Sequence, residues 1–86
     1  MSKPITFTRA KSIITKASAL QIGDGLYTYK IDDGYVDIYQ CGFDEALFGF
    51  SKGDEFYIEK DGTLTIVLDA GGTYNFTILK AVKLKA

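Results

Sequence analysis

Histidine and tryptophan are absent from this 86-residue sequence, which contains one cysteine and one proline. Without histidine the chain lacks the side chain that most often acts as a general base near neutral pH. The single Cys41 cannot form an intramolecular disulfide, and neither a histidine nor a cluster of cations lies near it to activate the thiol. We therefore expect Cys41 to be a small buried residue, and we expect a protein that is not an enzyme.

Long apolar runs are also missing. No stretch approaches the roughly 20 residues that a membrane-spanning helix needs, and the first residues, MSKPITFTRAKS, lack the apolar core of a signal peptide. Neither a glycine-rich phosphate loop nor the D-x-[DN]-x-[DN]-G spacing of a calcium loop occurs. These absences predict a single cytoplasmic domain over residues 1–86, without membrane partner, cofactor or metal.

The net charge of −1 hides an uneven distribution of charged residues. Residues 1–16 contain four cations and no acid, and residues 76–86 contain three lysines and no acid. Residues 17–75 contain all eleven acids and three lysines, which gives a net charge of −8. If the two ends of the chain lie side by side, their cations form one basic patch that could meet nucleic-acid phosphates. The residues of that patch would be Arg9, Lys11, Lys16, Lys80, Lys83 and Lys85.

The strongest structural signal is the stretch Glu55–Lys80, where two glycine turns separate three runs of β-branched and aromatic residues. Three-residue loops at residues 60–62 and 70–72 place the apolar residues on one face and most polar residues on the other. This pattern predicts a three-stranded meander with one face in the core. The expected pairs are Ile58 with Leu64 and Phe56 with Ile66 across the first loop, then Leu68 with Tyr74, Ile66 with Phe76 and Leu64 with Ile78 across the second.

A second hairpin is predicted over Leu26–Gln40. Here a two-residue Asp33-Gly34 turn of type I′ gives the consistent register, because it pairs apolar residues with each other and Lys30 with Asp37. The inner face would hold Tyr27, Tyr29, Ile31, Val36 and Ile38, and the outer face would hold Thr28, Lys30, Asp32, Tyr35, Asp37 and Tyr39.

The N-terminal part changes from a strand period to a helix period. Residues 5–8 alternate and suggest a short strand. Apolar residues then recur at helical spacing from Ala10 to Leu20, which predicts a helix over residues 9–21 with Thr8 as N-cap and Gly23 as its end. The alternative is a strand over residues 12–17, because Ile13-Ile14-Thr15 is β-branched.

The connector between the two sheet pieces is rich in phenylalanine. We predict one or two helical turns over residues 43–49, capped by Asp44 and ended by Gly49, followed by a turn at residues 51–54. Its large apolar side chains are expected to close one end of the core. The alternative is an exposed contact for a partner or a second copy. The side chains concerned are Phe43, Leu47, Phe48 and Phe50.

Together these elements predict an α+β fold, with a curved, mainly antiparallel sheet of five or six strands and one N-terminal helix. A small all-β barrel is the alternative if residues 12–17 form a strand.

The candidate binding residues are tyrosines of the outer sheet faces and acids of the loops. Exposed tyrosine offers a large contact area at low entropy cost, although it also suits an ordinary wet sheet face. Aspartate in a loop is most often chosen for turns and caps, but an acidic face can compete for the basic groove of a nucleic-acid-binding protein. The predicted partner-binding residues are Tyr35, Asp37, Tyr39, Tyr57, Asp32, Asp33, Asp44 and Glu45.

Two resemblances bear on function. The segment Leu47–Val67, LFGFSKGDEFYIEKDGTLTIV, resembles the second half of AbrB-type swapped-hairpin DNA-binding domains, which implies a short helix, a Gly-Asp turn and a hairpin. The residues before it, YVDIYQCGFDE, are acidic where that family has a basic strand. In composition, a small acidic sheet protein without catalytic residues resembles phage-encoded inhibitors, including anti-CRISPR proteins.

From these features we expect a non-enzymatic binding module that occupies a protein partner, in the narrower form a phage-type inhibitor with acidic loops. A nucleic-acid-associated regulator that uses the basic ends is the alternative. A third hypothesis is a structural subunit that assembles with further copies through the phenylalanine connector.

Overall fold

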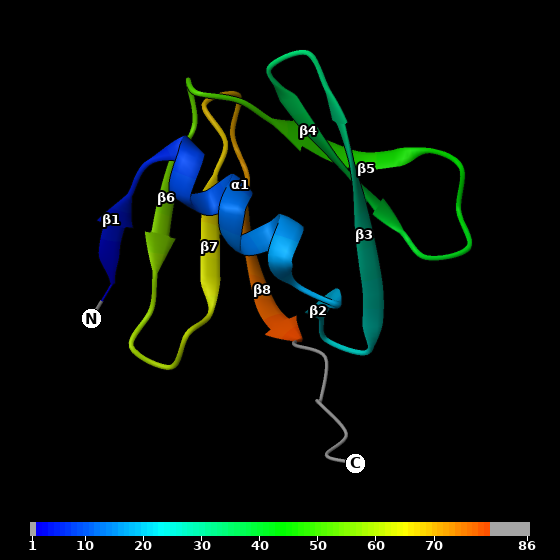
Figure 1. Cartoon of the computed structure of the whole chain (residues 1–86), viewed down its shortest axis with the longest axis horizontal. Coiled ribbons are helices and arrows are strands. Elements are labelled where there is room, and N and C mark those ends of the chain that lie inside the picture. The colour runs from blue at the N-terminus through cyan, green and yellow to red at the C-terminus, as the bar shows by residue number, and fades with distance from the viewer. Residues whose placement is uncertain (1, 80–86) are drawn as a thin grey trace.

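The computed structural model describes residues 2–79, which form one helix and eight strands (Figure 1). In chain order the elements are β1 (Lys3–Ile5), α1 (Phe7–Lys16), β2 (Ala19–Ile22), β3 (Gly25–Asp32), β4 (Tyr35–Gln40), β5 (Ala46–Phe50), β6 (Glu55–Ile58), β7 (Leu64–Val67) and β8 (Thr73–Leu79).

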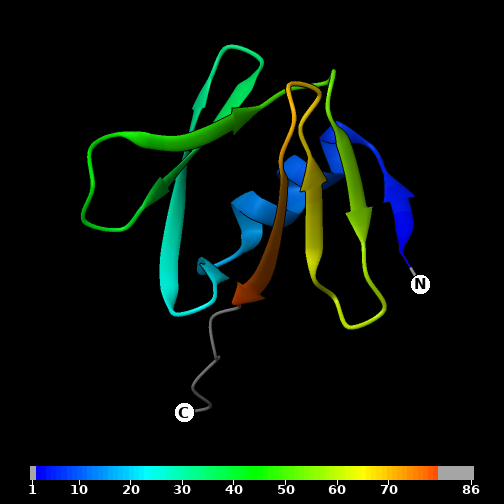
Figure 2. The same ribbon diagram turned by 180° about the vertical axis from the view of Figure 1, so that it is seen from behind.

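All eight strands belong to one antiparallel sheet in the order β1-β6-β7-β8-β2-β3-β4-β5. The first and last strands of this order do not pair, so the sheet is open. The α+β class is therefore confirmed, with more strands than predicted, and the all-β barrel is wrong. Helix α1 lies across β6, β7 and β8 in Figure 1 and behind them in Figure 2.

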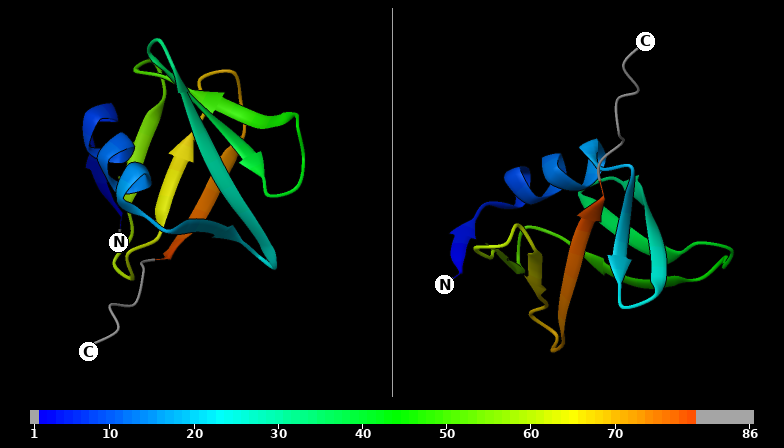
Figure 3. Two further views of the ribbon diagram at one scale, coloured as in Figure 1. Left: turned by 45° about the vertical axis from the view of Figure 1, so that its right-hand side comes forward. Right: turned by 90° about the horizontal axis from the view of Figure 1, so that it is seen from below.

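Two parts of the sheet face each other across the core, and Figure 3 shows how the sheet bends between them. We call β6–β8 (residues 55–79) the meander half and β3–β5 (residues 25–50) the hairpin half. Phe48 of β5 stacks on Tyr74 of β8 with ring centroids 3.9 Å apart. Phe7, at the start of α1, contacts Phe50 of β5 and Phe56 of β6, so the helix joins both halves.

The first meander turn has the predicted geometry. Glu59 donates its amide to Thr63 over 2.9 Å, and Gly62, with a φ of 91°, donates to Glu59 over 3.0 Å. This is a three-residue loop with glycine in the left-handed position. The predicted pairs Phe56–Ile66 and Ile58–Leu64 are confirmed.

The register predicted for the second meander turn is wrong by two residues. The loop is Asp69-Ala70-Gly71, and Leu64 pairs with Phe76 where the sequence suggested Ile78. In the expected register the Asp69 amide would donate to Thr73, but it donates to Oδ1 of Asp54 instead, over 2.8 Å. A shift of two residues keeps every side chain on its face. The inner face therefore has the predicted composition, with Phe56, Leu64, Ile66 and Phe76 buried.

The β3–β4 hairpin has the predicted two-residue turn and register. Asp33 and Gly34 have φ values of 34° and 86°, the positive values that a type I′ turn requires. Lys30 pairs with Asp37, and Val36 and Ile38 are fully buried. Ile31 was expected in the core, but it is 47% exposed because the end of the hairpin extends beyond the packed region.

The predicted helix exists, but its bounds differ from those expected. It starts earlier, because Thr6 is the N-cap and accepts a hydrogen bond from the Arg9 amide over 3.1 Å. It ends at Lys16, and the residues expected to continue it form β2, which pairs with β3 and β8. Leu20 is buried as predicted, but from a strand. The first strand ends at Ile5, so Phe7 belongs to the helix.

The connector was predicted to be helical, and this is wrong. Residues 46–50 form β5, which pairs with β4. Asp44 caps no helix, and Gly49 lies within the strand and does not end one. Pairing with β4 decides the structure, because it buries Phe48 and Phe50 in the core. Phe43 and Leu47 remain 63% and 46% exposed, so only half of the predicted apolar plug is inside.

Candidate partner-binding surface

Exposed large apolar side chains are concentrated in the hairpin half. Among the described residues, every large hydrophobic side chain that is about half exposed or more lies between positions 26 and 47. They form two groups at opposite ends of the β3–β4 hairpin: two flank its turn, and three lie at the start of β3, before β5 and at the start of β5. Exposed apolar side chains that gather on a protein surface are typical of an interaction site. They are Leu26, Ile31, Tyr35, Phe43 and Leu47.

The outer face of β3 and β4 brings together three of the predicted site residues. Tyr35, Asp37 and Tyr39 alternate on β4 and so share this face. Tyr35 is 56% exposed. Lys30, on β3, lies with its Nζ 4.9 Å from the centroid of the Tyr39 ring, a cation–π contact that orients this ring.

The acids predicted as site residues flank this face at its two ends. Asp32 and Asp33 lie at the β3–β4 turn, and Asp44 and Glu45 lie in the exposed connection before β5. None of these four carboxylates accepts a side-chain hydrogen bond from another residue of the described chain. The structure therefore separates them into two pairs, each beside exposed apolar side chains.

The acids near the meander half have structural roles instead. The carboxylate of Asp54 accepts hydrogen bonds from the amides of Ser51 and Asp69, both over 2.8 Å. The Asp61 carboxylate accepts from the Thr63 amide over 2.9 Å, and this hydrogen bond lowers the pKa of Asp61. These two aspartates confirm the turn role that the sequence suggested as the ordinary one.

Tyr57 does not join the other predicted tyrosines. It lies on β6, and the two halves pack through their inner faces, so their outer faces point away from each other. Its hydroxyl donates to Oε1 of Glu55 over 2.7 Å. This hydrogen bond, with smaller contributions from burial and from the Glu55 charge, raises the pKa of Tyr57.

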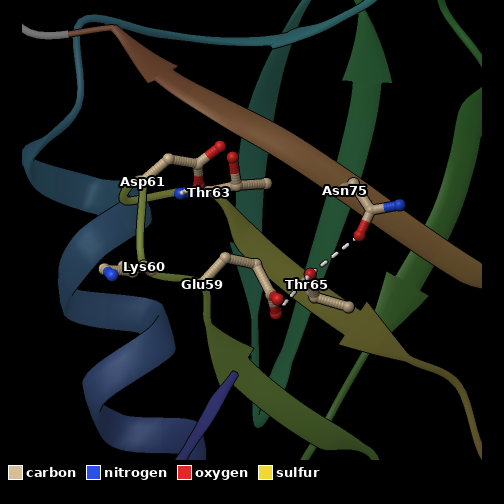
Figure 4. A pocket seen from close by; sticks show the side chains of 6 residues that line it. All are labelled: Glu59, Lys60, Asp61, Thr63, Thr65 and Asn75. Carbon is tan, nitrogen blue, oxygen red and sulfur yellow. Dashed lines mark hydrogen bonds between the residues drawn. The ribbon is translucent and has the colours of Figure 1, made fainter. Parts of the chain in front are cut away.

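A shallow polar groove of about 530 Å³ lies on the outer face of the meander half (Figure 4). In its floor the Thr65 hydroxyl is 2.7 Å from Oδ1 of Asn75 and 3.3 Å from Oε2 of Glu59. A hydroxyl has one proton, so it donates to one of these oxygens at a time. The groove residues thus bond largely to one another, which leaves few of their groups for a ligand.

A second cleft, of about 390 Å³, separates α1 from the ends of β6 and β8. Ile13, Ile58 and Ile78 form part of its lining, together with the cations Arg9 and Lys16. No acid is among its lining residues. Part of the predicted basic patch therefore lies at one cleft, and its C-terminal members Lys80, Lys83 and Lys85 lie outside the described residues.

Cys41 was expected to be buried, but it is exposed. It lies at the turn that leaves β4, where its amide donates to the Leu26 carbonyl over 2.9 Å, and no packed element covers its side chain. Within residues 2–79, no group of three or more candidate ligands is arranged to hold a metal ion. The helix of the described chain is too short and too polar to cross a membrane.

Sequence reasoning found Tyr35 and the acids of this surface but missed two apolar members, Leu26 and Ile31. Leu26 alternates onto the outer face of β3, a position that the hairpin register already implied. Strand alternation places Ile31 on the inner face, and nothing in the sequence shows that this end of the hairpin extends beyond the core. Phe43 and Leu47 correspond to the alternative in which the connector forms an exposed contact. Comparisons of the chain with protein-family models, curated proteins and solved structures find no match.

Proposed function

We propose that the protein is a non-enzymatic binding module that occupies a protein partner through the outer and end surfaces of its hairpin half. The observation that carries this proposal is the concentration of exposed apolar side chains in residues 26–47. Residues 25–50 also contain five acids against one lysine, a net charge of −4. A partner that fits this surface presents apolar contacts together with arginine or lysine.

Tyr35 is the expected anchor of the interface. It combines an exposed ring with a position next to the acids Asp32 and Asp33 at the β3–β4 turn, and interface energy concentrates in such aromatic anchors. The flanking acids guide encounter with a basic surface and act over about 10 Å at 0.1 M salt. The narrower hypothesis, an inhibitor of phage type, requires that this partner be a nucleic-acid-binding protein whose basic groove is blocked.

Affinity capture with purified protein tests the proposal. Wild-type protein should recover one partner in a fixed ratio from a lysate of the cells that encode it, and less of it at high salt. Replacing Ile31 with Ser and Tyr35 with Ala should reduce recovery at least about tenfold, since loss of a central aromatic contact costs 2 kcal/mol or more. Both side chains are exposed, so the fold should persist, which circular dichroism can verify.

The matched control changes the opposite face. Tyr57→Ala with Thr65→Ala removes one tyrosine and one β-branched side chain from the outer face of the meander half and should leave recovery unchanged. Equal loss in both variants would indicate that no particular face binds. Retention of the partner by the Ile31 and Tyr35 variant would remove the turn and outer face of β3 and β4 from consideration.

A nucleic-acid-associated regulator is the second candidate, supported by the cations at the cleft beside α1. The AbrB-type resemblance adds nothing to it, because residues 46–50 form a strand where that family would have a helix. Retention on a DNA column that falls steeply with salt, and that is lost on Arg9→Gln with Lys16→Gln, would favour this candidate over the first. The cytoplasmic location remains a prediction in either case.

Assembly of further copies through the connector, the third hypothesis, would have to use Phe43 and Leu47. Phe48 is 8% exposed and stacks on Tyr74, so it serves the core. Measuring the mass in solution for wild type and Leu47→Asp tests this hypothesis without disturbing the core. A monomer in both cases excludes it.

A further inference from the structure

The open sheet has two free edges, and they differ in their ability to accept another strand. β1 has three residues, and its central Pro4 has no amide hydrogen to donate. β5 has five residues, ALFGF, with neither proline nor charge. Proteins usually protect an edge strand by making it short or by adding charge or proline. β1 has two of these protections, and β5 has only a bulge near one end.

The hydrogen-bond phase of the hairpin determines which way the backbone groups of β4 point. In an antiparallel pair, residues exchange hydrogen bonds at every second position. A two-residue turn makes Asp32 and Tyr35 the first bonded pair, so every second residue of β4 bonds to β3. Cys41 lies six residues after Tyr35, and its amide donates to the Leu26 carbonyl, which fits this alternation. The intervening residues, Val36 and Ile38, therefore bond to β5.

The same alternation applies to β5. Its residues opposite Val36 and Ile38 are Phe50 and Phe48, whose backbone groups face β4. Gly49 lies between them, so its N–H and C=O point away from the sheet at the free edge. Gly49 is thus the position where a strand added to β5 would form a bonded pair.

A carboxylate lies over this position. A Cβ added to Gly49 would be 2.6 Å from Oδ1 of Asp37, so the Asp37 side chain occupies the space that a side chain at Gly49 would take. Lys30, the cross-strand partner of Asp37, has its ammonium group over the Tyr39 ring. The contact with Gly49 shows that the Asp37 carboxylate is directed toward the edge strand.

We propose that β5 accepts an extended segment of the protein partner as an additional strand, with an arginine or lysine of that segment opposite Gly49 and against Asp37. This inference rests on the proposed function and specifies its mode. The added strand bonds to the Gly49 N–H and C=O, as in other cases of β-augmentation. Because Gly49 has no side chain, the long basic side chain can pass over it to the carboxylate. The exposed Leu47 supplies an apolar contact next to this pair.

Charge decides between a heterologous segment and a second copy of the chain. Pairing of β5 with β5 of a second copy around Gly49 would bring two Asp37 carboxylates together over two glycines. The hairpin half carries a net charge of −4, so the two copies would also repel each other over a longer range. A basic segment meets attraction at the same place, and like charges across strands are destabilising.

Peptide binding tests the proposal directly. The probes are the labelled heptapeptides TVTRTVT and TVTETVT, which differ only in the central charge. We expect the arginine peptide to bind about fivefold more tightly than the glutamate peptide, as a partly exposed ion pair allows. In amide hydrogen exchange the Gly49 N–H should be unprotected in the free protein, in contrast to Phe48 and Phe50. It should become protected when the arginine peptide is bound.

Two variants make the test specific. Asp37→Asn should abolish the preference for the arginine peptide without loss of fold. Asp69→Asn removes the same charge from the exposed loop between β7 and β8 in the meander half and should leave the preference intact. Equal binding of both peptides, absence of binding at the highest soluble concentration, or protection at residues other than Gly49 would overturn the proposal. The proposal would also be overturned if the Gly49 amide were protected without peptide and this protection increased with protein concentration. That result would show that a second copy of the chain binds the edge.

The outcome is separable from that of the proposed function. If partner recovery depends on Tyr35 while the peptides do not protect Gly49, the hairpin half binds without strand addition. If the peptides bind at Gly49 while the Ile31 and Tyr35 variant recovers the partner normally, the edge is a binding site and the outer face is not.

Discussion

The meander half and the hairpin half use similar residues in different ways. In and next to the meander half, the carboxylates of Asp54, Asp61 and Glu55 accept hydrogen bonds from nearby groups. In the hairpin half, the acids at the β3–β4 turn and in the connection to β5 accept none within the described chain. All exposed large apolar residues of that chain also lie in the hairpin half. One half of the sheet thus uses its acids for hydrogen bonds within the fold, and the other half presents its acids and apolar side chains at the surface.

The two halves differ because they meet the core differently. The meander half has α1 across its inner face, and its strands β6 and β7 have four residues each, of which only one is exposed. The eight-residue β3 is longer than the packed region, and its exposure rises toward the turn. Polar groups of the meander half therefore find partners in its own turns. Side chains at the end of the hairpin half have nothing within the described chain to cover them.

Phe50→Ala is the variant with the largest expected effect on stability, because Phe50 is fully buried and contacts both Phe7 and Phe56. We expect it to lower the free energy of unfolding by about 3–5 kcal/mol, the usual cost of truncating a buried phenylalanine. Leu47→Ala, on the outer side of the same strand, should cost less than about 0.5 kcal/mol. Urea unfolding of both variants measures the difference. Similar costs would show that the outer side of β5 is also packed.

Asp54→Ala tests the scaffold role of an acid. It removes the acceptor of two backbone amides, and hydrogen bonds to charged groups contribute about 1.5–3 kcal/mol. We expect a loss of about 2 kcal/mol in the free energy of unfolding and faster exchange of the Asp69 amide.

The control for this variant is Asp44→Ala in the hairpin half, which should change the free energy of unfolding by less than about 0.5 kcal/mol. A large effect of Asp44→Ala would mean that the acids of both halves are structural, and the contrast between them would fail.

The sequence was sufficient wherever a local rule determined the structure. The Asp33-Gly34 and Lys60-Asp61-Gly62 turns, with their registers, followed from alternation and from where glycine is needed. The face partition of the meander half also followed. Each of these features depends on neighbours within a few positions in the chain.

The sequence was not sufficient where a distant partner decided the outcome. Two adjacent glycines at 71 and 72 allow two loops, and a hydrogen bond from the Asp69 amide to the Asp54 carboxylate accompanies the one that forms. Residues 46–50 have a pattern that fits a helical turn, but β4 pairs with them. The end of the N-terminal helix is decided similarly by pairing of β2 with β8. Among the candidate site residues, strand alternation placed Tyr35, Asp37 and Tyr39 on one face. It could not show that the outer face of the meander half, which carries Tyr57, points away from them.

The smallest expected effect concerns Tyr57 and tests whether the tyrosines of the two halves are chemically distinct. Its hydroxyl donates to Glu55, which favours the protonated phenol and raises the pKa of Tyr57 above its ordinary value. Because this is a folded-state pKa raised above the unfolded one, the hydrogen bond is fully present below the ordinary tyrosine pKa and is lost as the pH rises through the raised value. Glu55→Gln removes the carboxylate charge, so the pKa of Tyr57 should fall toward the ordinary value.

A pH titration of the tyrosine ring signals by NMR, assigned residue by residue, measures this shift, and Glu59→Gln on the same half is the matched control. Glu59 contacts Thr65 and has no hydrogen bond to Tyr57, so its replacement should leave the titration of Tyr57 in place. If Tyr57 instead titrates at the ordinary value in the wild type, its hydroxyl is free. The outer face of the meander half would then be as available to a partner as Tyr35, and the assignment of binding to the hairpin half alone would lose one of its supports.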